Sequence, residues 1–162
     1  MSVTMNQAVA AIKAMLDKRS YKYDFHDDKN IFVVRFNLKT KLGNTCIFIR
    51  VRPRSADASL CSNISSHAYV DLKADEGCMA QICEYITRAN YGLIMGNFEM
   101  DHSDGEIRYK HSVDAWEGVP TDSALSDLIN IPLNMLDKYG DGLLAVSMGF
   151  LDPKAAIEKA EA

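Results

Sequence analysis

Two runs of alternating apolar side chains, separated by an Asp-Gly pair, constrain the fold of this chain more than any other feature. The runs span residues 94–100 and 107–113, and the pair is Asp104 and Gly105. An Asp-Gly pair between two alternating runs is a strong signal for a β-hairpin, because both residues fit its tight turn. Successive side chains of a strand point to opposite faces, so the pattern also predicts that one face of this hairpin is buried.

The first half of the chain contains further alternating runs, which extend the predicted sheet. A short strand is expected over residues 21–25, and longer strands over residues 32–38 and 45–51, each with one apolar face. Residues 58–65 are a weaker candidate because of their serine and asparagine content, and residues 54–71 read as irregular. We therefore expect an antiparallel sheet of about five to six strands joined by short turns.

Apolar side chains at helical spacing predict helices before, between and after these strands. The expected helices cover residues 4–19, 75–90, 125–144 and 154–160. Pro132 lies inside the third of them and should kink or locally open that helix. The order helix, strands, helix, hairpin and long helix predicts an α+β fold in which helices pack on an antiparallel sheet.

The hairpin region and the C-terminal segment also resemble a known family. Residues 90–101 are similar to the pattern of the YbjN family, in which a helix ending in Asn leads into a strand carrying Gly-x-Phe. Residues 104–109 look like that family's return strand, and residues 149–157 look like its usual ending. The resemblance implies a fold like that of type III secretion chaperones and a role as a bacterial sensory transduction regulator. It implies no catalytic residues.

Composition narrows the class of protein. The length of 162 residues suits a single domain spanning residues 1–162, and the net charge of -4 argues against a nucleic-acid partner. The N-terminus lacks the pattern of a signal peptide, and no apolar stretch is long enough for a membrane span. We therefore expect a cytoplasmic protein without a membrane partner, in which the four cysteines are reduced thiols.

Tests for known catalytic and metal-binding motifs fail, so we expect no enzyme, no cofactor and no metal. In an EF-hand loop with Gly105 as its glycine, Met100 would hold the position of the first aspartate. Cys78 and Cys83 have four residues between them, whereas zinc knuckles usually have two. A group of carboxylates near the hairpin is better explained by turn formation than by catalysis; it comprises Asp101, Asp104 and Glu106.

Two of the predicted strands carry apolar side chains on both faces, which a sheet with one solvated face does not require. The second face of the strands over residues 32–38 and 45–51 should be polar if it met only water. It instead carries apolar side chains beside arginines, and the candidate partner-binding residues are Ile31, Val33, Cys46, Phe48, Arg50 and Arg52. Two interpretations stay open: a helix of the same chain covers this face, or the face binds a protein partner. In the second case we expect a homodimer or a bound polypeptide.

The sequence leaves three functions open. We favour a non-catalytic regulatory or chaperone-like domain that engages a polypeptide through a sheet face. The alternatives are a small-ligand-binding or enzymatic domain with a pocket near the Pro132 kink, and an accessory subunit without a ligand. Trp116, in a predicted loop, either anchors a partner or pins its own loop to the core.

Overall fold

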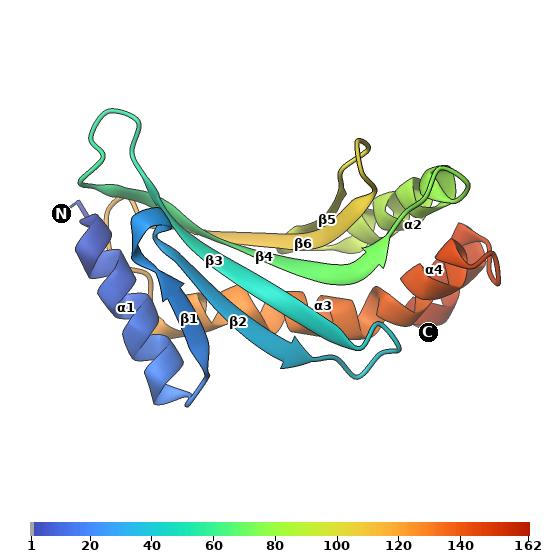
Figure 1. The fold of residues 1–162 in the computed structure, drawn as a ribbon, viewed down its shortest axis with the longest axis horizontal. Helices are drawn as coiled ribbons and strands as arrows, with labels where there is room; N and C mark the ends of the chain where they lie inside the picture. Colours follow the sequence, from blue (N-terminus) through green and yellow to red (C-terminus); the bar gives the residue numbers. More distant parts are fainter. Residues whose placement is uncertain (1) are drawn as a thin grey trace.

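The computed structural model describes residues 2–162 and confirms the predicted α+β class and the order of its elements. Within this range, one antiparallel sheet has six strands in the order β1-β2-β3-β4-β6-β5 (Figure 1). The strands are β1 (Tyr23–His26), β2 (Ile31–Asn37), β3 (Asn44–Pro53), β4 (Cys61–Lys73), β5 (Asn97–Met100) and β6 (Glu106–Asp114). The helices are α1 (Met5–Lys18), α2 (Met79–Gly92), α3 (Asp122–Ser147) and α4 (Pro153–Glu161), with a short 3-10 turn, η1 (Asp27–Lys29), between β1 and β2.

The helix starts follow from local capping chemistry. Thr4 and Gln7 form a capping box at α1: the Thr4 hydroxyl accepts from the Gln7 backbone N–H at 3.2 Å, and the Gln7 side chain accepts from the Thr4 N–H at 2.9 Å. Asp152 caps α4 with Pro153 as its first residue, as the sequence predicts. α2 begins later than predicted, because the Asp75 carboxylate accepts from two following backbone N–H groups and holds that segment in a turn.

β4 is the largest correction to the sequence-based prediction. Residues 61–73 form the longest strand, and it lies in the centre of the sheet between β3 and β6. The prediction that residues 54–71 are irregular was therefore wrong beyond residue 60. The misleading signal is the run Ser65, Ser66 and His67, whose polar side chains are nonetheless buried in the strand. Their small or flat shapes fit the crowded middle of the sheet.

The helices cover a single face of the sheet. Phe32, Val34, Ile47 and Ile49 are almost completely buried there, in one cluster with helix residues such as Leu128. Figure 1 shows α3 running along this side of the strands, and within residues 2–162 no helix covers the opposite side. We call the opposite side the open face.

α3 continues through Pro132 without interruption, so the predicted opening of this helix was wrong. Pro132 is buried, and it does not line any hollow described below. The missing N–H costs one helical hydrogen bond, but the apolar stripe on either side of Pro132 packs on the sheet and keeps the helix intact. No helix in the described range, α3 included, is long and apolar enough to cross a membrane.

Two glycines in α3 mark where other elements approach it most closely. A Cβ at Gly140 would lie 2.7 Å from the Leu42 side chain, in the turn between β2 and β3. A Cβ at Gly142 would lie 2.2 Å from the hydroxyl oxygen of Tyr85, which donates to the Tyr139 carbonyl at 2.7 Å. These glycines allow the β2–β3 turn and α2 to pack closely on one helix.

Candidate functional site

The open face carries apolar side chains that no helix covers. Ile31 and Val33 on β2 are only 6% and 4% exposed, yet they lie outside the core cluster that the helices share. Phe48 on β3 is half-buried and pairs in register with Val33. Asp24 on β1 pairs in register with Val33, and its side chain forms an ion pair with that of Arg35 on β2, at 2.7 Å. The first of the two open interpretations, a helix over this face, is therefore wrong.

A hollow of about 590 Å³ lies in the open face over β3 and β4. Phe48 and Tyr69 meet in it edge to face, with ring centroids 5.3 Å apart. Apolar and aromatic groups are thus combined with cationic side chains around one cavity, as in many binding sites. Its lining residues are His26, Lys29, Ile31, Phe48, Arg50, Arg52, His67, Tyr69, Glu106 and Arg108.

A row of side-chain contacts crosses the open face from β5 to β3. Arg108 on β6 donates from Nε to a Glu99 carboxylate oxygen at 2.8 Å and from a terminal nitrogen to the Tyr69 hydroxyl at 3.2 Å. Lys110 forms a second ion pair with Glu99. Burial acts to raise the pKa of Glu99, but the bonds from Lys110 and Arg108 outweigh it and lower that pKa. The β5–β6 end of the open face is thus held by internally paired charges.

The structure brings together four of the six sequence-predicted residues: Ile31, Phe48, Arg50 and Arg52 all line the hollow. Val33 and Cys46 lie on the same face beside it, and Cys46 pairs in register with Tyr69. Sequence reasoning missed the other six lining residues, which are His67, Tyr69, Arg108, His26, Lys29 and Glu106. The signal for the first two was the alternation along residues 63–71, which was obscured by the serines on the strand.

His67 is a buried histidine under the arginines of the hollow. Its side chain is 8% exposed and lies opposite Phe48 in register. Burial, together with the charges of Arg108 and Arg52, lowers the pKa of His67 to about 4. The imidazole is therefore neutral at pH 7, and the positive charge of the hollow comes from lysine and arginine side chains.

The buried His67 should make the free energy of unfolding depend on pH. The unfolded chain binds a proton at His67 near its ordinary pKa of 6.5, whereas the folded protein binds it only near pH 4. Stability should therefore fall as the pH drops through this window, by up to about 3 kcal/mol from this residue. Urea unfolding of the wild type and His67→Gln between pH 7 and 4.5 measures the effect. Burial also lowers the pKa of His111, so the free energy of unfolding should still fall somewhat with pH in both proteins. An equal fall in the wild type and in His67→Gln would contradict the assignment to His67.

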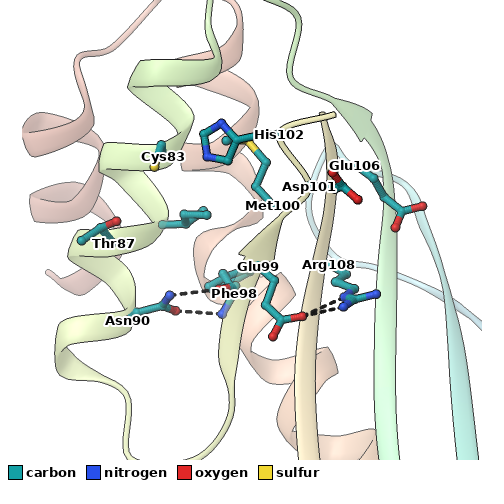
Figure 2. Close-up of a pocket in the computed structure, with 11 residues that line it drawn as sticks. Cys83, Thr87, Asn90, Phe98, Glu99, Met100, Asp101, His102, Glu106 and Arg108 are labelled. Atoms are coloured by element: carbon teal, nitrogen blue, oxygen red, sulfur yellow. Dashed lines mark hydrogen bonds and ion pairs between the residues drawn. The ribbon is translucent and has the colours of Figure 1, made fainter. Parts of the chain in front are cut away.

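A second hollow, of about 630 Å³, lies between α2 and the β5–β6 hairpin (Figure 2). Asn90 on α2 forms two hydrogen bonds with the backbone of Phe98, at 2.8 and 3.0 Å, and so occupies part of the free edge of β5. Glu106 and Arg108 line both hollows, so the two hollows are adjacent, and we call them together the groove. The groove runs from the β2–β3 end of the sheet to α2.

Two of the three carboxylates tested for catalysis form turn contacts, and the cysteines form no disulfide. Asp101 accepts from the backbone and hydroxyl of Ser103, and Asp104 accepts from the Glu106 backbone, as predicted for turn residues. All four cysteines are free thiols, and burial raises the pKa of Cys61. Among residues 2–162, no three or more histidine, cysteine, aspartate or glutamate side chains are arranged to hold a metal ion.

Trp116 is held by its own chain. The guanidinium of Arg54 lies 4.1 Å from the centre of its ring and also donates to the Cys61 carbonyl at 3.0 Å. The same arginine bonds to the Trp116 carbonyl. These contacts favour a role in pinning the loop, although half of the indole stays exposed.

Comparison with known proteins identifies a matching family. A family model named YbjN, with the description "Putative bacterial sensory transduction regulator", matches residues 8–145. The matched range contains all six strands and both hollows, but not residues 149–157, one of the segments that suggested the resemblance. No curated protein matches the chain.

Proposed function

Since the chain belongs to the YbjN family of bacterial sensory transduction regulators, we propose that it regulates by binding an extended segment of a protein partner along its open face, without catalysis. The likeness to type III secretion chaperones stays a prediction. So do the cytoplasmic location and the homodimer.

The observation that carries the proposal is the two-sided burial of β2 and β3. Antiparallel sheets with one solvated face normally present polar side chains to water. Here Ile31, Val33 and Phe48 point away from every helix and gather beside a hollow. Apolar surface of this kind, rimmed by polar and charged groups, is typical of a protein-binding site.

The shape of the groove favours an extended segment over a compact ligand. The two hollows share Glu106 and Arg108, and together their lining residues come from β2, β3, β4, β6, β5 and α2. A chain lying across them would place successive side chains in different parts of the groove, which is how extended peptides are usually recognised.

Selection from a library of short random-sequence peptides tests the proposal. The wild-type protein should enrich peptides that then bind in solution, as measured by fluorescence anisotropy with the labelled peptide. Light scattering on the same samples gives the oligomeric state and hence the stoichiometry. Failure to enrich any peptide above the level of an uncoated surface would contradict the proposal.

A further inference from the structure

The arginines of this chain differ sharply in how they are paired. Of the seven, four form ion pairs, and Arg54 is held by carbonyl groups and Trp116. The two that remain, Arg50 and Arg52, both line the hollow over β3 and β4. The ion-paired arginines are Arg19, Arg35, Arg88 and Arg108.

Among residues 2–162, most of the charged side chains that line this hollow without an ion-pair partner are positive. Within residues 2–162, the side chains of Arg50 and Lys29 form no hydrogen bond or ion pair, and the side chain of Arg52 bonds only to the Ser65 hydroxyl, at 3.2 Å. Glu106 is the only carboxylate among the residues that line this hollow. A chain with a net charge of -4 therefore keeps a local excess of positive charge beside the half-buried Phe48 and the neighbouring Ile31.

The other end of the groove has the opposite character. The hollow beside α2 is lined by three carboxylates, those of Glu99, Asp101 and Glu106, and its one arginine, Arg108, is already paired with Glu99. An anionic group would be repelled there and attracted at the β3 end. Charge therefore restricts where such a group can bind.

We propose that the hollow over β3 and β4 takes an acidic stretch of polypeptide, whose carboxylates bond to Arg50 and Arg52 and whose apolar side chains lie on Phe48 and Ile31. This inference rests on the proposed function and names its partner's chemistry. An apolar floor favours a polypeptide over a nucleic acid, because a nucleic-acid site needs many cationic contacts along the phosphate backbone. Arginine is suited to the role because its planar group can hold a carboxylate through two parallel hydrogen bonds.

The charge of the selected peptides tests this proposal. Peptides enriched on the wild type should carry more aspartate and glutamate than the starting library, and their binding should weaken as salt is added. Arg50→Gln should weaken binding about tenfold, since a bond to a charged group is lost. Because the Arg50 side chain has no partner among the residues that the structure describes, the midpoint of urea unfolding of this variant should equal that of the wild type. Arg52→Gln should also weaken peptide binding.

Arg35→Gln is the matched control, because Arg35 is an exposed arginine on the same face that is paired with Asp24 and does not line the hollow. It should change binding less than about twofold. Enrichment of neutral or basic peptides would overturn the acidic partner while leaving the proposed function intact. Equal losses of peptide affinity in Arg35→Gln and Arg50→Gln would do the same. No enriched peptide at all would overturn both. A single-stranded oligothymidine that binds more tightly than the peptides, and is lost in Arg50→Gln, would also overturn it.

Discussion

Phe48→Glu is expected to weaken the binding of the selected peptides at least about 100-fold, while the protein stays folded. Phe48 lines the hollow, where it contacts Tyr69 and lies between Val33 and His67 in register. A glutamate there removes the apolar floor. Its carboxylate also lies near Arg52 and Arg50, where it competes for the charges that a partner would use.

The cost to folding should be small by comparison. Phe48 is half-buried and lies outside the core cluster, so the variant loses one aromatic contact and part of an apolar surface, about 1–2 kcal/mol. Fluorescence anisotropy measures the binding, and urea unfolding measures the stability. Phe150→Glu provides the control, because Phe150 is 76% exposed between α3 and α4 and should change neither quantity. Near-normal peptide binding by folded Phe48→Glu would exclude the open face as the site.

Gly105→Ala should produce the largest loss of stability, about 3–5 kcal/mol. Gly105 has a φ of +72°, and a Cβ there would lie 1.9 Å from the carbonyl oxygen of Ala74. The clash is with backbone, which cannot rotate away as a side chain can. The same two residues are joined by a hydrogen bond from the Ala74 N–H to the Gly105 carbonyl, at 2.9 Å, which ties the hairpin turn to the end of β4.

Gly43→Ala separates the two causes of this loss. Gly43 also has a positive φ, of +81°, but a Cβ there would meet no atom within 4 Å. Its replacement should cost only the strain of the left-handed conformation, about 1 kcal/mol. Urea unfolding compares the two variants with the wild type. Equal losses would show that the close approach of Ala74 contributes nothing.

The parts of the fold that could be predicted are those fixed by neighbours in sequence. The hairpin around Asp104 and Gly105, the capping of α1 by Thr4 and the start of α4 at Pro153 each depend on a few adjacent residues, and all three are observed, although the first hairpin strand begins at Asn97 and not at residue 94. β4 could not be predicted in the same way. Its serines and His67 are acceptable only because β3 and β6 surround it, which is a property of the folded sheet.

In the candidate site, too, some residues could be predicted from local sequence and others depend on the folded sheet. Ile31, Val33 and Phe48 could be found because their alternation places them opposite an apolar face. Which face the helices would cover depends on packing between distant segments, so the sequence left that open. Tyr69 and Arg108 come next to Phe48 only through the register of β4 with β3 and β6, and no local pattern specifies that register.

Methyl chemical shifts of isoleucine and valine, recorded while a selected peptide is added, test most directly whether the open face is the binding surface. Ile31 and Val33 should show the largest changes, while Ile47 and Ile49, on the helix-covered face of the neighbouring strand, should change little. Ile94, which is 98% exposed in the loop before β5, reports on binding elsewhere. Largest changes at Ile94 or on the helix-covered face, with Ile31 and Val33 unaffected, would contradict the account.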